Sequence, residues 1–121
     1  MAGAFVRAAD YVNATRLRRK MADAFHALFA DIDVALTASS MDPACRIDDP
    51  RAIDHTYSRQ ARAPFNVTGN PALAVPIGFS KSGLPLSMQI VGSAYGEALV
   101  YRVADAYEQA TDWTARHPQL Q

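Results

Sequence analysis

Apolar residues recur at helical spacing along the first quarter of the chain. No glycine or proline stands between Phe5 and Ile32. Successive steps of four, four, three and four residues separate the apolar positions Leu17, Met21, Phe25, Leu28 and Ile32. This spacing places their side chains on one face of a helix. The pattern therefore predicts a long helix over 5–32 with an apolar face that must be buried.

A strand and a long connection are predicted next. Val34 to Leu36 form a short apolar run between polar ends, which is typical of a buried strand. The following segment, 41–63, is polar and is interrupted by Pro43 and Pro50. We expect a long connection there, with one helical turn at 54–61. Links of this length are uncommon inside a compact domain and are often functional.

Two apolar runs around a polar loop predict an antiparallel hairpin. The runs are "PALAVPIGF" and "LPLSMQIVG", and the loop between them is "SKSG". Pro76 has no N–H for a sheet ladder, so we expect it at a strand end, an edge or a bulge. The residues just before the first run, "NVTGNP", form a cluster typical of turns.

Gln89 is the polar residue of interest in this hairpin. Strict alternation puts Leu86, Met88 and Ile90 on one face and Ser87, Gln89 and Val91 on the other. We expect Gln89 to be buried and to bond the backbone of the turns at 66–70, because a buried amide needs a partner. The alternative is an exposed position on a sheet with one covered face.

The last element is a second helix. Leu99, Val103, Tyr107 and Ala110 recur at helical spacing, which predicts a helix over 96–111. The fold class is therefore α/β, in a single domain over 1–121. Its order is a long helix, a strand, a long link, an antiparallel hairpin and a final helix.

Composition and charge exclude several kinds of partner. Lysine and arginine together number 12, as do aspartate and glutamate, so nothing favours nucleic acid or an anionic membrane. No apolar run approaches the length of about 20 residues that spans a bilayer. Cys45 is the only cysteine, which suits a reducing compartment. Because no signal peptide is recognisable, we expect a cytoplasmic location.

The candidate chemical groups are sparse. Ser39 and Ser40 are adjacent, but neither lies in a glycine-flanked elbow and no lysine or histidine is near in sequence. The histidines, His26, His55 and His117, are too scattered to predict a metal site. From the residues alone we expect no metal and no cofactor.

One long stretch resembles the C-terminal end of the amidase signature family. The stretch is "PFNVTGNPALAVPIGFSKSGLPLSMQIVG", followed by "GEALVYRVADAYEQATDW". The positions that match the family pattern in order are Pro64, Phe65, Asn66, Gly69, Pro71, Ala72, Val75, Pro76, Gly78, Gly83, Leu84, Pro85, Gln89, Val91, Gly92 and Glu97. Residues 8–39 are similar to the family's long helix and following strand. Leu36 to Ser39 depart from its usual Leu-Thr-Pro-Thr.

The resemblance implies hydrolysis of carboxamide C–N bonds within a larger mixed sheet. The family uses a nucleophilic serine, a second serine and a lysine, which lie upstream of the region resembled here. This chain has no Gly-Gly-Ser-Ser stretch, and its lysines, Lys20 and Lys81, match no family position. We therefore expect no catalytic residue in this chain and no activity of the chain alone.

The resemblance also suggests a binding role. The segment 62–68 is the candidate wall of the pocket for a small amide substrate, with Phe65, Asn66 and Thr68 as the binding residues. The glutamine-using branch has an acidic residue shortly before the Asn turn, where this chain has residues 59–62, "RQAR". That difference favours aliphatic or aromatic carboxamides over glutamine.

Two hypotheses about partners remain open. In the first, the chain is the C-terminal portion of an amidase, and its partner is the missing N-terminal part. In the second, it is a non-catalytic domain that stands alone and associates with itself. In either form we expect an uncovered apolar face and free sheet edges, for which a homodimer is the simplest solution.

Overall fold

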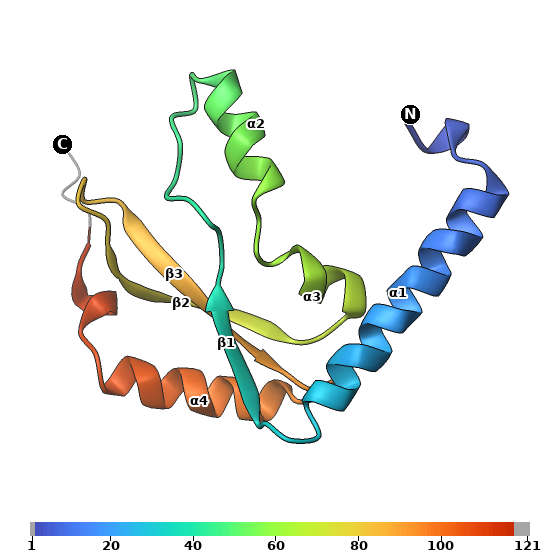
Figure 1. The fold of residues 1–121 in the computed structure, drawn as a ribbon. Helices are drawn as coiled ribbons and strands as arrows, with labels where there is room; N and C mark the ends of the chain where they lie inside the picture. Colours follow the sequence, from blue (N-terminus) through green and yellow to red (C-terminus); the bar gives the residue numbers. More distant parts are fainter. Residues whose placement is uncertain (1, 118–121) are drawn as a thin grey trace.

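A long helix, a three-stranded sheet and a final helix make up most of the molecule (Figure 1). A computed structural model describes residues 2–117. The elements are η1 (Ala2–Phe5), α1 (Ala8–Leu28), β1 (Val34–Ala38), α2 (Pro50–Ser58), α3 (Ala63–Thr68), β2 (Ala72–Phe79), β3 (Pro85–Gly92), α4 (Glu97–Gln109) and η2 (Trp113–Ala115). The predicted α/β class, the hairpin and both long helices are confirmed.

The sheet is antiparallel, with β3 between β1 and β2. Ile90 of β3 lies opposite Leu36 of β1 and Leu73 of β2. The ladder between β2 and β3 shifts register between Pro76 and Gly78. Pro76 thus lies at a bulge on a strand that forms an edge of the described sheet, as its missing N–H predicts.

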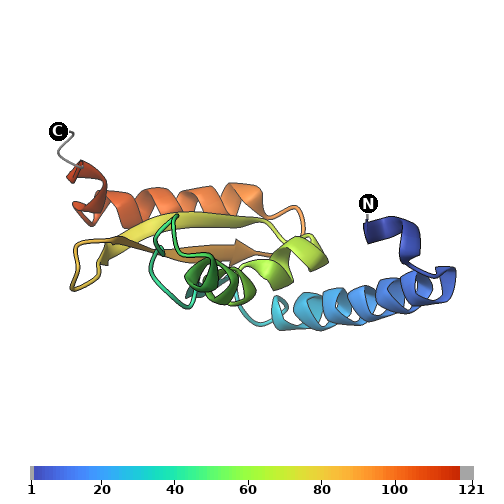
Figure 2. The same ribbon diagram turned by 90° about the horizontal axis from the view of Figure 1, so that it is seen from above.

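Helix α4 covers one face of the sheet (Figure 2). Val75 and Ile90 from the sheet and Val100 and Ala104 from α4 form a buried cluster. The helix approaches closely because Gly92 has no side chain. A Cβ at Gly92 would lie 2.7 Å from Cγ2 of Val100. The core of the molecule is therefore the layer between β2, β3 and α4.

The opposite face of the sheet carries Gln89 and Val91, which are 4% and 0% exposed. The predicted burial of Gln89 is confirmed, but the predicted partner is wrong. Its Nε2 donates to the carbonyl oxygen of Ala38 at 3.1 Å. In the sheet register Gln89 lies opposite Thr37, so its side chain reaches the end of β1 rather than the turns at 66–70. From those turns, Asn70 Nδ2 instead donates to the Gly92 carbonyl at 3.0 Å.

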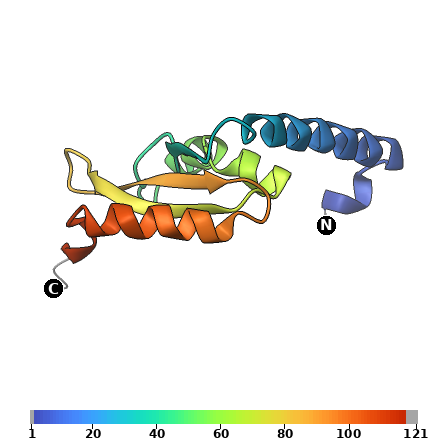
Figure 3. The same ribbon diagram turned by 90° about the horizontal axis from the view of Figure 1, so that it is seen from below.

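Helix α1 extends away from the sheet and contacts α3 (Figures 1 and 3). The Phe25 and Phe65 rings meet edge to face with centroids 5.4 Å apart. Arg18 Nε also donates to the Val67 carbonyl at 2.6 Å. No residue of α1 is buried, so the apolar face that the sequence predicts is uncovered in this chain. The helix spans 8–28 rather than 5–32, because a tight turn follows Leu28.

The link between β1 and the hairpin is more helical than the sequence predicts. Helix α2 begins at Pro50, and the Asp49 side chain caps it by accepting from Ala52 N at 3.0 Å. The predicted turn "NVTGNP" is wrong in its first half, since residues 66–68 belong to α3. Gly69, at φ +82°, ends that helix in the left-handed conformation. Proline at the start and glycine after the end define this short helix.

Aromatic packing fixes the segment after α4 on the hairpin. The Trp113 ring lies 3.6 Å from the position that a Cβ of Gly78 would take. Its ring also meets Phe79 edge to face, with centroids 6.4 Å apart, and the Arg116 guanidinium lies over both rings. Within residues 2–117, no helix is both long and apolar enough to cross a bilayer.

Candidate functional site

An open cleft of about 400 Å³ lies between the link after β1, the C-terminal end of α2 and the hairpin. Its polar lining comes from Ser40, Asp42, Thr56, Gln60, Arg62 and Ser87. Met41, Ile77 and Leu86 are among its apolar lining residues. Pockets of this size with a few polar groups on an apolar surface are typical binding sites for small molecules.

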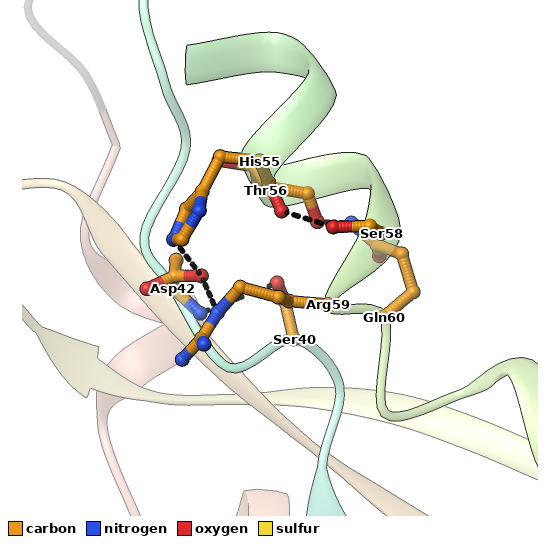
Figure 4. Close-up of polar contacts among 7 residues, drawn as sticks. All are labelled: Ser40, Asp42, His55, Thr56, Ser58, Arg59 and Gln60. Atoms are coloured by element: carbon orange, nitrogen blue, oxygen red, sulfur yellow. Dashed lines mark hydrogen bonds and ion pairs between the residues drawn. The ribbon is translucent and has the colours of Figure 1, made fainter. Parts of the chain in front are cut away.

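Asp42 holds the link against the end of α2 (Figure 4). Arg59 Nε donates to Asp42 Oδ2 at 2.7 Å, and His55 Nε2 lies 3.8 Å from the same oxygen. Met41 N donates to the Arg59 carbonyl at 3.2 Å, which adds a backbone tie between the same two segments. Two walls of the cleft are therefore connected in the structure without any ligand.

Serine, histidine and aspartate side chains meet here, but they do not form a catalytic triad. Ser58 Oγ donates to the carbonyl oxygen of His55 at 2.8 Å, and Ser40 Oγ accepts from Asp42 N at 3.4 Å. Neither bond involves the imidazole ring (Figure 4). A nucleophilic serine needs its hydroxyl on a base that a third group orients. This cluster is better described as a fastening between two chain segments.

Two buried side-chain oxygens have no hydrogen-bond partner within the described residues. They are Ser39 Oγ and Gln60 Oε1. Gln60 is held through its nitrogen, which donates to the Thr56 carbonyl at 2.9 Å. An unpartnered buried polar atom costs about 1–3 kcal/mol. Ser39 is only 6% exposed, so its hydroxyl is shielded from any substrate in solution.

The predicted pocket wall lies on α3, beside the cleft. Phe65 is 7% exposed and contacts Phe25, so in this structure it fastens α3 to α1. Asn66 is exposed. The Thr68 hydroxyl lies 2.7 Å from Asn70 Oδ1 and 3.1 Å from the Pro64 carbonyl oxygen. None of Phe65, Asn66 and Thr68 lines the cleft, whereas Arg62, at the start of the same predicted segment, does.

Sequence reasoning did not single out Ser40, Asp42 and Gln60 as neighbours. They come from opposite ends of the long link, which folds back on itself. The available signal was the length of that link, because long irregular segments often line functional surfaces. Nothing local in the sequence predicts that Asp42 pairs with Arg59, 17 positions further along.

Charge is balanced locally along the link. Arg46 Nε donates to Asp48 Oδ1 at 2.8 Å, and this bond lowers the pKa of the exposed Asp48 carboxyl below its ordinary value. Across residues 2–117, no group of three or more His, Cys, Asp or Glu side chains is placed to hold a metal ion. The sites that remain are the cleft and the surface of α3.

Sequence comparison finds a strong match to one enzyme family. The family model described as Amidase matches residues 1–101. The corresponding subunit of the glutamyl-tRNA(Gln) amidotransferase of Brevibacillus brevis is 39% identical over 115 residues, covering 92% of this chain and 23% of that protein. The same subunit from a Cyanothece species is 37% identical over 93% of this chain and 24% of that protein. The chain thus spans about a quarter of the length of these curated relatives.

Solved structures give the same result. The 6-aminohexanoate cyclic dimer hydrolase complexed with substrate superposes with a TM-score of 0.77 at 28% identity, over 96% of this chain and 27% of that chain. The glutamyl-tRNA(Gln) amidotransferase subunit of Thermotoga maritima superposes with a TM-score of 0.71 at 31% identity, over 85% of this chain and 23% of that chain.

Proposed function

Because the chain belongs to the amidase family, we propose that it is the C-terminal portion of an amidohydrolase that cleaves carboxamide C–N bonds. The observation that carries the proposal is the family match over residues 1–101 in a chain that spans about a quarter of its relatives. In this proposal the chain supplies three strands of the sheet and part of the substrate pocket. The nucleophilic serine, the second serine and the lysine base come from an N-terminal part.

The uncovered surfaces support this assignment. Helix α1 has no buried residue although it is 21 residues long, and Leu17 on it is 61% exposed. Strands β1 and β2 each pair on one side only among the described residues. Unpaired edges and broad apolar surfaces are normally covered by further structure. The rest of an amidase would cover them.

For the pocket wall we propose α3 and the residues before it. Asn66 is the exposed amide on this helix, and it can donate to or accept from a ligand. Phe65 and Thr68 would set the position of the wall, through the Phe25 ring and the Asn70 side chain. This division of roles predicts that Asn66→Ala weakens substrate binding while Phe65→Ala weakens the attachment of α3.

The substrate we propose is a small aliphatic or aromatic carboxamide. The relatives include both an amidotransferase that acts with glutamyl-tRNA(Gln) and a hydrolase of the cyclic dimer of 6-aminohexanoate. Arg59 and Arg62 lie at and beside the cleft, where they give it positive rather than negative charge. This charge is the reason to favour a carboxamide without a free amino group. We further propose a cytoplasmic location.

The alternative is a non-catalytic domain that associates with itself. The exposed apolar side of α1 favours it, and a two-fold dimer is the commonest symmetry. Sedimentation of the purified chain at micromolar concentration distinguishes the cases. A dimer supports self-association, and a clean monomer argues against it.

The assignment of catalysis to the missing part is tested on the purified chain. We expect no hydrolysis of simple carboxamides and no label from a fluorophosphonate probe, because activation of a serine needs a base within hydrogen-bond reach. Ser58 and Ser40 make other bonds. Labelling of one serine that disappears when that serine is changed to alanine would overturn the assignment.

A further inference from the structure

We propose that the cleft between the link after β1, the end of α2 and the hairpin binds a small carboxylate with an apolar body. The carboxylate would bond the guanidinium of Arg62, and the body would lie on Met41, Ile77 and Leu86. The cleft measures about 400 Å³, which is within the range for small-molecule sites.

Arg62 is the cation of the cleft that is available to a ligand. Its side chain is exposed and makes no hydrogen bond or ion pair within residues 2–117. Arg59, three residues earlier, is already bonded to Asp42 at 2.7 Å. A guanidinium presents a planar fork of donors that matches the two oxygens of a carboxylate. Anionic ligands are therefore favoured over neutral ones of the same shape.

The acidic group in the lining does not oppose this charge. Asp42 also lines the cleft, but Arg59 neutralises its carboxylate and His55 Nε2 lies 3.8 Å away. A ligand carboxylate would thus meet an ion pair and a free guanidinium rather than an uncompensated negative charge. Like charges brought together would otherwise cancel the attraction.

The backbone around Arg62 is held in place before any ligand binds. Ala63 N donates to the Gln60 carbonyl at 3.2 Å, and Phe65 N donates to the Arg62 carbonyl at 3.2 Å. Gln60 is tied to α2 through Thr56. A binding group on an ordered backbone loses less conformational freedom when a ligand arrives. The position of the guanidinium stem is therefore defined by the fold.

Apolar surface at the cleft gives the ligand its second requirement. Met41 is 60% exposed and Ile77 is 38% exposed, and both line the cleft. Covering apolar surface contributes about 25 cal/mol for each Å² removed from water. Ser40 and Ser87 add hydroxyl groups at the rim. Short chains with an acid at one end fit this combination better than sugars or nucleotides.

The origin of the carboxylate rests on the proposed function. Hydrolysis breaks the C–N bond of a carboxamide, adds water and leaves a carboxylate and an amine. The ligand is then either this acid product or a substrate amide that carries a separate carboxylate. Hexanoate stands for the first and N-hexanoylglycine for the second, while hexanamide is the neutral control.

Calorimetric titration of the purified chain with these three compounds tests the proposal. We expect hexanoate or N-hexanoylglycine to bind, hexanamide to bind at least about tenfold more weakly, and high salt to reduce the difference. The tighter of the two acids identifies the source. Equal binding of hexanamide, or no binding of either acid, overturns the proposal.

Variants locate the site. Arg62→Gln should lower carboxylate affinity on the order of tenfold and leave hexanamide unchanged, because one charged hydrogen-bond partner is removed. Arg102→Gln is the matched control, since Arg102 is also exposed but lies on α4, across the sheet. An Arg62→Gln chain that binds hexanoate as the parent does, with an unchanged circular dichroism spectrum, contradicts the assignment. The titration involves no catalysis, so its failure is distinct from labelling of the chain by a serine probe.

Discussion

At the scale of single residues, Gln89 joins the central strand to the end of its neighbour. Its side chain is 4% exposed, and its nitrogen bonds the Ala38 carbonyl at the last residue of β1. The same carbonyl also accepts from Thr37 Oγ1 at 2.9 Å. Loss of the glutamine therefore leaves that acceptor with one partner.

Gln89→Leu should lower the free energy of unfolding by about 1–2 kcal/mol, because a buried hydrogen bond is lost while its acceptor keeps another donor. Gln109→Leu is the control, since Gln109 is exposed on α4 and bonds only Asp105. Urea unfolding of both variants measures the difference. Equal stability of the two would show that the bond to Ala38 contributes nothing.

Ser39 makes the opposite case. Its hydroxyl is buried and has no partner within the described residues. Ser39→Ala removes an atom that lost its water on folding, so we expect unchanged stability or a gain of up to about 1 kcal/mol. Thermal unfolding measures this directly. A loss of stability would reveal a partner for the hydroxyl.

At the scale of elements, the docking of α4 on the sheet depends on one glycine. The Cβ position at Gly92 lies 2.7 Å from Cγ2 of Val100, which is 3% exposed. The residues that α4 covers form the buried core. Any side chain at 92 would have to push the helix and strand apart.

Gly92→Ala should therefore destabilise the chain by about 1–3 kcal/mol through overpacking. Gly3→Ala is the matched control, because nothing lies within 4 Å of a Cβ at Gly3. Chemical denaturation followed by circular dichroism compares the two variants. If Gly92→Ala costs no more than Gly3→Ala, the contact between α4 and β3 is looser than described.

The sequence predicts elements well where a period extends over many residues. The repeats of Leu17 to Leu28 and of Leu99 to Tyr107 predict α1 and α4, and strict alternation predicts β3. Helix α3 has six residues, too few to show a period, so its sequence resembles a turn. The hydrogen bond of Gln89 and the ion pair of Asp42 depend on residues distant in the chain, which pattern alone does not bring together.

At the scale of the whole molecule, the surfaces left uncovered are as informative as the core. The buried cluster lies between α4 and the sheet, whereas α1 touches α3 and extends beyond the rest (Figure 1). Phe5 and Leu17 are 87% and 61% exposed. Large apolar surfaces of this kind mark sites of association. The family match identifies the rest of an amidase as our proposed partner.

A chimaera measures that partnership most directly. The region of the 6-aminohexanoate cyclic dimer hydrolase that superposes on this chain would be replaced by residues 1–121. The readout is labelling by a fluorophosphonate serine probe. If this chain completes an amidase, the chimaera is labelled, whereas the hydrolase without that region and this chain alone are not. A soluble, folded chimaera that takes no label would contradict the account.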